Sequence, residues 1–343
     1  MKKMPLCSEC FQDEGLKLDA FQIGIKRNTT CMNCKSQLGR KLTLELIEDL
    51  TWRFFVQGTE LKVEYGGAPL IQYNTFHYQN TKVDFGEAVN TDIKLLEREL
   101  KMGFFHYGPR LWTLGHVVPL KKLQSKATRN EIIKRIIREF PIKYLEETDK
   151  FYRIRKNPEY IEDINQYDSN PTPGSGRLDS LDLPILYASQ DLEVCIHETR
   201  VTVEDILYIA TLSPLSKLKL LDLTATIEEG VKYEFDSLDI AVKMLLSAGN
   251  HSYEIARDIA KATKENGFDG IIYPSYFSTL RTGSEGNFTS KFKDETDNDS
   301  YVIPNLGLFG NPIKEDKISV KSINRLILDK VDYKVSFGPA KFD

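Results

Sequence analysis

The chain lacks the features that mark secreted and membrane proteins. It has 343 residues but only five cysteines and two tryptophans. The opening segment MKKMPLCSEC carries two lysines with no apolar stretch after them, so we do not expect a signal peptide. No window approaches the roughly 18 uninterrupted apolar residues of a membrane helix. We therefore expect a cytoplasmic protein with no membrane contact, whose reduced thiols form no disulfide framework.

Charge of one sign is not in excess either. The 46 Lys and Arg residues nearly balance the 50 Asp and Glu residues, which leaves a formal net charge of -4. The balance indicates neither a strongly basic nucleic-acid binder nor an acidic tail. Hydrophobic residues make up 41% and charged residues 28%, as in ordinary globular proteins. This length allows about two domains with cores of their own.

Four of the five cysteines form two close pairs. Cys7 and Cys10 make the first pair, and Cys31 and Cys34 make the second. A CxxC turn directs two thiolates at one metal ion, and two such turns complete a tetrahedron. The spacing therefore predicts a four-cysteine zinc ribbon over residues 1–45. Because four thiolates leave no open position for water or substrate, we expect the zinc to be structural.

A second interpretation makes the ribbon a contact module for nucleic acid or protein. Lys26 and Arg27 lie between the two cysteine pairs, and Lys35 and Arg40 follow them. Recognition of nucleic acid needs a dense basic surface, and this density is too modest to predict one. Nucleic-acid binding therefore stays open.

The rest of the chain mixes helical and strand-like patterns. Apolar residues at helical spacing predict helices over 42–55, 91–101, 128–140, 192–199, 238–247 and 252–266. Apolar runs predict strands over 184–188, 206–212, 218–223 and 268–273. We assign residues 46–145 to a helical or mixed amino-terminal region. Short strands with helices inserted between them predict an α+β domain over 146–343, not an alternating βαβ arrangement.

Four short segments of this last region stand out together. They are Phe151-Tyr-Arg-Ile-Arg155, Gly174-Ser-Gly-Arg177, Leu186-Tyr-Ala-Ser-Gln-Asp-Leu-Glu-Val-Cys-Ile-His-Glu-Thr-Arg200 and Gly270-Ile-Ile-Tyr-Pro-Ser275. In this order they resemble the RES domain, a family named for its Arg, Glu and Ser that supplies the toxin of Res–Xre toxin–antitoxin pairs. The resemblance covers roughly residues 150–310. It implies an ADP-ribosyltransferase-like fold, with a split, mainly antiparallel sheet and a nicotinamide cleft.

The resemblance also implies an activity. Members of the family degrade NAD by cleaving the nicotinamide–ribose bond, so the expected enzyme is an NAD glycohydrolase or an NAD phosphorylase. The sequence does not decide between water and phosphate as the acceptor, and it leaves the oligomeric state open. A toxin or phage-defence role would follow, with restraint by an Xre-type antitoxin or another regulator.

Five positions match the functional residues of the family. Arg153 and Arg177 suit the pyrophosphate of NAD, because guanidinium groups form forked, charge-assisted bonds with phosphate oxygens. Tyr187 offers an aromatic face to the flat nicotinamide cation. Glu198 is expected to stabilise the positive charge that develops on the ribose. Ser275 is expected to hold ribose or nicotinamide by hydrogen bonds.

Two further residues are candidates for substrate binding. One is Tyr152, the aromatic residue next to the first family arginine, and the other is Arg281. Arg281 comes six residues after Ser275, where the family has a shorter run to its arginine. The sequence also departs from the family at Leu178 and Asp179, where the family has an aromatic residue and Asn.

Other functions remain open beside this one. An ADP-ribosyltransferase acting on a macromolecule would use the same cleft. The segment before residue 117 contains Arg110 and His116, a little like the paired Arg and His of HEPN ribonucleases, and the amino-terminal region loosely resembles one that precedes RES or HEPN domains. A non-catalytic module would bind NAD without turnover. Singly, each residue also fits a plain structural role, such as Tyr187 in a sheet core.

Overall fold

The computed structural model describes residues 3–63, 66–75, 81–107, 117–230, 234–278, 302–333 and 335–340. The chain folds as two compact units, each with its own core. We call the first the cysteine unit; it comprises Met1–Val63, Gly67–Leu111 and Tyr333–Asp343. We call the second the sheet unit; it comprises Glu64–Gly66 and Trp112–Asp332.

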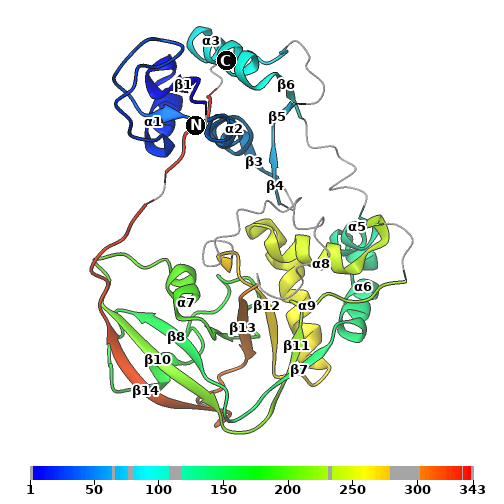
Figure 1. The fold of residues 1–343 in the computed structure, drawn as a ribbon. Coiled ribbons are helices and arrows are strands. Elements are labelled where there is room, and N and C mark those ends of the chain that lie inside the picture. The colour runs from blue at the N-terminus through cyan, green and yellow to red at the C-terminus, as the bar shows by residue number, and fades with distance from the viewer. Residues whose placement is uncertain are drawn as a thin grey trace. The chain divides into compact units, whose positions relative to one another are not determined.

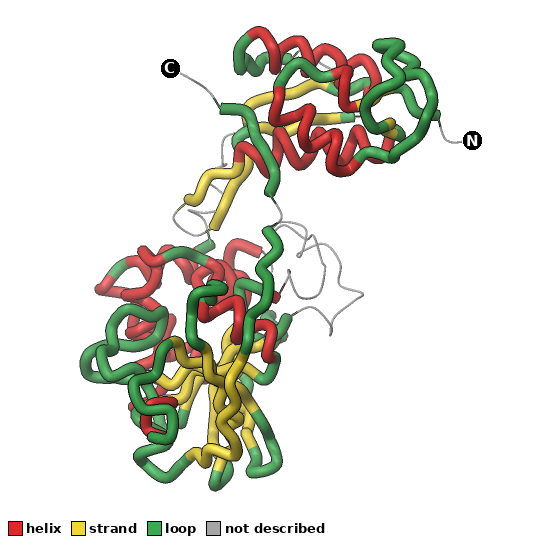
Figure 2. Tube along the Cα trace, turned by 90° about the vertical axis from the view of Figure 1, so that its left-hand side faces the viewer, coloured by secondary structure: helices red, strands yellow, loops and turns green. Residues whose placement is uncertain are grey.

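The sheet unit is built on an eight-stranded sheet whose strands lie side by side in the order β14-β10-β8-β9-β13-β12-β11-β7 (Figure 1, Figure 2). The strands are β7 (Ile142–Leu145), β8 (Phe151–Lys156), β9 (Ile185–Ser189), β10 (Leu207–Pro214), β11 (Leu218–Asp222), β12 (Gly270–Pro274), β13 (Pro304–Phe309) and β14 (Ile318–Leu326). All neighbouring pairs are antiparallel except β11 with β12. The predicted α+β class with a mainly antiparallel sheet is confirmed.

The sheet opens between β8 and β9. Strand β8 pairs with β10 from Leu207↔Lys156 to Leu212↔Phe151 without interruption. Its ladder with β9 consists of a single pair, Tyr152 with Ser189. The two strands therefore diverge and leave main-chain groups at the opening that need other partners.

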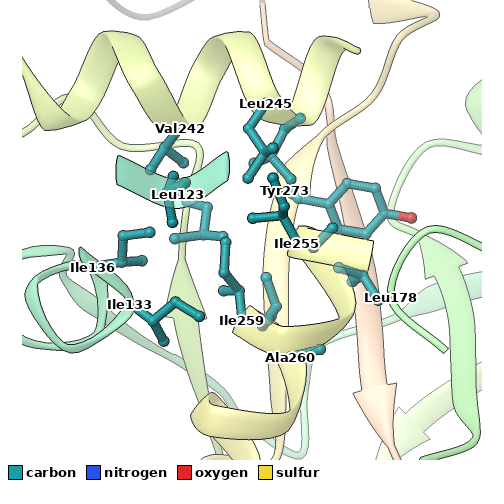
Figure 3. Packing of buried hydrophobic residues seen from close by; sticks show 14 of the residues in the cluster. Leu123, Ile133, Ile136, Leu178, Val242, Leu245, Ile255, Ile259, Ala260 and Tyr273 are labelled. Carbon is teal, nitrogen blue, oxygen red and sulfur yellow. The ribbon is translucent and has the colours of Figure 1, made fainter. Parts of the chain in front are cut away.

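The described residues of the sheet unit form the helices α5 (Val118–Gln124), α6 (Lys126–Glu139), α7 (Leu192–Thr199), α8 (Leu238–Ser247) and α9 (Tyr253–Glu265). The largest core lies among α5, α6, α8, α9 and one face of the sheet, and Figure 3 shows part of it. In that view Leu123, Ile133 and Ile136 face Val242 and Ile259. Because α5 and α6 bury their apolar faces here, they fold with the sheet unit, although the sequence grouped them with region 46–145.

The central strands of the sheet, such as β9, bury both of their faces. Ile185 on β9 belongs to the helix-side core, whereas Leu186 and Ala188 belong to a second cluster with Phe151 and Leu306. Side chains alternate across a strand, so neighbouring residues enter different cores. A third, smaller cluster lies under α7 around Cys195, which is buried.

The cysteine unit is assembled from short elements. They are β1 (Leu6–Cys7), α1 (Glu14–Ile23), β2 (Lys41–Leu42), α2 (Leu44–Thr51), β3 (Glu60–Val63), β4 (Gly66–Pro69), β5 (Ile71–Asn74), α3 (Glu87–Leu100) and β6 (Gly103–His106). Asp13 and Thr43 cap α1 and α2 by accepting bonds from Leu16 N and Leu46 N. The segment 335–340 returns to this unit, where Phe337 N donates to Asp19 Oδ2 at 3.1 Å.

Short turns complete the backbone. The 3-10 turns span Ser8–Cys10, Gln57–Thr59, Ile164–Tyr167, Glu234–Asp236 and Asn250–Ser252, and α2 continues as a π turn over Trp52–Val56. Among the described residues, no helix combines the length and apolar character that crossing a membrane requires.

Candidate functional site

A carboxylate with two donors on one oxygen marks one end of the sheet. Glu198 lies in the last turn of α7, a helix that Asp191 caps by accepting from Val194 N at 3.0 Å. Glu198 Oε1 accepts from Ser275 Oγ at 2.7 Å and from Asn305 Nδ2 at 2.7 Å. The residue is exposed, and among the described residues no donor is bonded to Oε2. The carboxylate is therefore fixed at one oxygen and accessible at the other.

Ser275 is positioned by the strand that precedes it. It follows β12 directly, its main-chain N donates to Ile303 O at 3.0 Å, and its Oγ accepts from Phe277 N at 3.1 Å. With that acceptor role filled, the hydroxyl proton is directed at Glu198. Two residues that the sequence singled out 77 positions apart are thus in direct contact.

Tyr187 organises the loop that carries Arg177. Its hydroxyl accepts from Leu178 N at 2.8 Å and from Asp179 N at 3.0 Å, and it donates to Asp179 Oδ1 at 2.9 Å. Burial raises the pKa of the Tyr187 phenol, and the Asp179 carboxylate raises it further, so the phenol stays neutral. A Cβ on Gly176 would lie 2.7 Å from that hydroxyl, which requires glycine there. The departure from the family pattern at Asp179 thus has a structural role.

Arg153 spans the opening between β8 and β9. Its Nη1 donates to Tyr187 O at 2.6 Å and its Nη2 to Asp168 O at 2.8 Å. Burial lowers the pKa of Arg153 to about 9, and the charge of Arg155 acts in the same direction, yet the group stays protonated at neutral pH. Its Nε is buried and has no partner among the described residues. Arg153 therefore contacts the site through the main chain of Tyr187.

Arg177 lies at the carboxyl end of α8. Its Nη2 donates to Ala248 O at 3.0 Å and its Nη1 to Leu245 O at 3.4 Å, where a cation also complements the helix dipole. The guanidinium lies over the ring of Tyr253, 4.9 Å from the ring centroid. Arg257, on the next turn of α9, donates to Gly174 O and Gly176 O at 2.8 Å and so fixes the glycine-rich loop.

Tyr273 joins these residues, although the sequence did not single it out. It lies on β12, is 8% exposed, and points its hydroxyl away from the apolar cluster (Figure 3). Burial raises its pKa well above the usual range, and the neighbouring Tyr187 and Glu198 raise it further while Arg177 lowers it. Tyr187, Glu198 and Arg177 therefore all lie within electrostatic reach of one phenol.

Tyr152 lies on β8 at the single pair with β9. Its carbonyl accepts from Cys195 Sγ at 3.1 Å, and its side chain packs, half-buried, against the cluster under α7. Burial raises the pKa of Cys195 to about 12, so the thiol stays protonated and unreactive. Three residues named from the sequence, Arg281, Arg110 and His116, lie outside the described residues.

The four paired cysteines of the cysteine unit converge. Their Sγ atoms all lie within 4.8 Å of one another. The separations are 3.9 Å for Cys7 to Cys10, 3.5 Å for Cys7 to Cys34 and 3.5 Å for Cys10 to Cys31. A tetrahedral Zn²⁺ with Zn–S bonds of about 2.3 Å places its sulfurs about 3.8 Å apart, so the cluster fits that ion.

Buried polar groups hold the two knuckles in place. Lys41 is opposite Cys7 in the β1–β2 pair and is only 1% exposed. Its Nζ donates to the carbonyls of Leu38 at 3.0 Å and Gly39 at 3.2 Å, in the loop after the second knuckle. Asp92 of α3 accepts from the main-chain N of the two residues that precede α1. The cluster is thus anchored from both sides.

Comparison with known proteins agrees with the motif segments. The family model described as RES domain matches residues 150–288, so this segment of the chain is similar to the RES domain family. No curated protein matches the chain. Among solved structures, a chain from "Crystal structure of the M.tuberculosis MbcT-MbcA toxin-antitoxin complex" is similar with a TM-score of 0.34 and 13% identity, over 57% of this chain and 91% of that chain. A similarity of this size does not indicate a function.

Proposed function

We propose that the sheet unit is an enzyme that cleaves the nicotinamide–ribose bond of NAD. One observation carries the proposal: Glu198 is held at a single oxygen by Ser275 and Asn305, beside the phenol of Tyr273. Glu198, Ser275 and Tyr273 lie in the segment that the RES family model matches, and Asn305 lies beyond it. A fixed, accessible carboxylate beside aromatic side chains suits a reaction in which a flat aromatic cation leaves a sugar.

The chemistry assigns each group a task. As the bond to nicotinamide breaks, positive charge grows on the ribose, and the free Oε2 of Glu198 stabilises it or bonds the ribose hydroxyls. Nicotinamide is a good leaving group without protonation, so the reaction needs no general acid. Ser275 keeps the carboxylate in place and bonds ribose or nicotinamide. Tyr187, and Tyr152 at the neighbouring strand, provide the aromatic surface.

Arg153 and Arg177 have different roles in this proposal. Arg153 is buried and engaged with two carbonyls, so it acts by holding the main chain of Tyr187. Arg177 is only half-buried, and its 3.4 Å bond to Leu245 O is weak, so its Nη1 is available to a phosphate oxygen. Arg281 remains a second candidate for the pyrophosphate.

We infer a biological role and a regulatory partner from the family resemblance, and a structural metal ion from the cysteine cluster. An enzyme that depletes NAD would act as a toxin or phage-defence effector, and it would need restraint by an Xre-type antitoxin or another regulator. We place it in the cytoplasm, where NAD is available and thiols stay reduced. The cluster of Cys7, Cys10, Cys31 and Cys34 would bind a structural zinc ion.

The test is to incubate the purified chain with NAD, with and without phosphate, and to identify the products. Release of nicotinamide with ADP-ribose indicates hydrolysis, whereas a phosphorylated ADP-ribose indicates phosphorolysis. Replacing Glu198→Gln should lower kcat by about 100-fold or more, because one preorganised electrostatic contact to the transition state is lost. Glu193→Gln, on the exposed side of the same helix, is the matched control and should keep full activity.

The outcomes separate the alternatives. A folded wild-type chain that releases no nicotinamide refutes the proposal. Transfer of labelled ADP-ribose to a macromolecule, with release of nicotinamide but little free ADP-ribose, identifies an ADP-ribosyltransferase that uses the same carboxylate. Cleavage of RNA that persists in Glu198→Gln identifies the HEPN-type activity of the segment with Arg110 and His116.

A further inference from the structure

We propose that Asn305 is a positioning residue that holds the Glu198 carboxylate in place for the reaction. The proposal deepens the proposed function and rests on it. Asn305 lies on β13, beyond the segment that the RES family model matches, and none of the sequence motifs contains it. Its role follows from the sheet register and from one hydrogen bond.

The register places Asn305 at the centre of the site. It is directly opposite Ser189 of β9 and Tyr273 of β12. Residues directly opposite one another in an antiparallel sheet point to the same face, so these three side chains share the face toward Glu198. Asn305 is only 3% exposed, and its Nδ2 lies 2.7 Å from Glu198 Oε1. The donor is therefore held by strand pairing rather than by a mobile loop.

An amide donor at this position has a specific consequence. The N–H of Asn305 and the O–H of Ser275 both bind Oε1 and so fix the orientation of the carboxylate. An amide cannot lose a proton at ordinary pH, so this donor is present throughout the working range. With Oε1 occupied twice, the remaining oxygen is the one presented to substrate.

Other titrating groups near Glu198 are few among the described residues. Tyr273 and Cys195 interact with it electrostatically. Burial raises the pKa of Tyr273 well above its usual range and that of Cys195 to about 12, so neither ionises on the acid side. His197, the neighbour of Glu198 on α7, stacks on Phe277 with ring centroids 5.4 Å apart.

The decisive variant is Asn305→Asp in the full chain. It keeps the shape of the side chain but places a second carboxyl against Oε1, and two such carboxyls resist ionising together. The acid limb of kcat/KM should move upward by about one pH unit or more, and kcat at neutral pH should fall by about tenfold or more with KM little changed. Asn324→Asp, the same change at an exposed position on β14, should leave the profile unchanged.

A second variant and a measurement without turnover complete the test. Asn305→Ala removes the donor but adds no charge, so kcat should fall with a smaller movement of the acid limb. The ¹³C chemical shift of the Glu198 carboxyl, identified by its absence in Glu198→Gln, should titrate at higher pH in Asn305→Asp than in wild type. Because this signal needs no substrate, it tests the positioning role even if NAD is not cleaved.

The failures are distinguishable. A wild-type chain that leaves NAD intact, with the expected movement of the carboxyl signal, refutes the proposed function alone. Turnover of NAD with identical acid limbs and identical carboxyl titrations in wild type and Asn305→Asp overturns the role of Asn305 alone.

Discussion

The two units of this chain bury polar groups for different purposes. In the cysteine unit, Lys41 and Asp92 are almost fully buried and bind main-chain groups of the loops beside the cysteine cluster. In the sheet unit, Asn305 and Ser275 are similarly buried, but they bind the side chain of an exposed carboxylate. Buried polar groups that hydrogen-bond to the main chain stabilise a loop. Those that hydrogen-bond to an exposed carboxylate fix the position of that side chain.

The two units also differ in what holds them together. The sheet unit has three apolar clusters on the two faces of its sheet. The described residues of the cysteine unit form one apolar cluster, and the segment 24–40, which holds the second cysteine pair, contributes no residue to it. Short segments without a sufficient core depend on a metal or another crosslink. We therefore expect the two units to respond differently to the same treatments.

Metal removal should produce the largest difference. A structural Zn²⁺ contributes on the order of 10 kcal/mol in small zinc domains, which exceeds what a unit of this size retains without it. A chelator, or the double substitution Cys10→Ser with Cys31→Ser, should unfold the cysteine unit and leave the sheet unit folded. Hydrogen exchange by mass spectrometry on the full chain resolves both units in one experiment.

The control for metal removal uses the fifth cysteine. Cys195→Ala removes a thiol of the sheet unit that lies outside the cluster, so exchange in the cysteine unit should stay at the wild-type level. Equal loosening of both units after chelation would show that their stabilities are not separate. Unchanged exchange in both would show that the cluster stabilises nothing.

The next largest effect should come from Arg153→Met in the sheet unit. The substitution leaves the buried carbonyls of Tyr187 and Asp168 without these donors, at a cost of about 2–4 kcal/mol, which relief from burying the charge reduces only in part. Denaturant unfolding should show this loss in the sheet unit and none in the cysteine unit. Arg325→Met, at an exposed position on β14, is the matched control and should stay within about 0.5 kcal/mol of wild type.

This variant also distinguishes two roles for Arg153. A residue that only bound the pyrophosphate of NAD would raise KM on substitution and leave stability unchanged. A residue that spans the opening between β8 and β9 lowers stability with or without NAD. If Arg153→Met unfolds at the same denaturant concentration as wild type, Arg153 does not stabilise the opening, and the role of phosphate ligand is favoured.

Short-range patterns in the sequence predicted much of this molecule. The CxxC spacing predicted a four-thiol cluster because two residues of one turn must face the same point. Helix α7 has the bounds predicted for it, since Asp191 caps an apolar pattern at helical spacing. The RES resemblance, and with it the neighbourhood of Glu198 and Ser275, followed from segments that are contiguous in sequence.

What the sequence did not reveal depends on sheet register. Tyr273 was visible only as part of a buried strand, and Asn305 follows a polar segment with no motif of its own. Both enter the site because β12 and β13 pair in one register, and a shift of one residue would turn both side chains to the other face. The assignment of α5 and α6 to the sheet unit likewise depends on tertiary packing. Helical periodicity predicts which face of a helix is apolar but not which element packs against that face.

The smallest expected difference concerns pH. In the cysteine unit, burial raises the pKa of Asp92 above its usual 3.8, so ionising it costs stability as the pH rises. In the sheet unit, hydrogen bonding to Arg135 lowers the pKa of Glu139 below its usual 4.5, so this group stabilises above that pH and the contribution is lost on acidification. The two carboxyls therefore have opposite dependence on pH.

Neutral amides at the two positions isolate these contributions between pH 4 and 7. The stability of Asp92→Asn relative to wild type should improve as the pH rises, because the amide avoids the cost of a buried charge. The stability of Glu139→Gln relative to wild type should worsen over the same range, by about 1 kcal/mol or less. Taking each difference at a single pH cancels any effect of acid on the cysteine cluster that variant and wild type share. Slopes of the same sign would show that Asp92 and Glu139 do not stabilise their units with opposite dependence on pH.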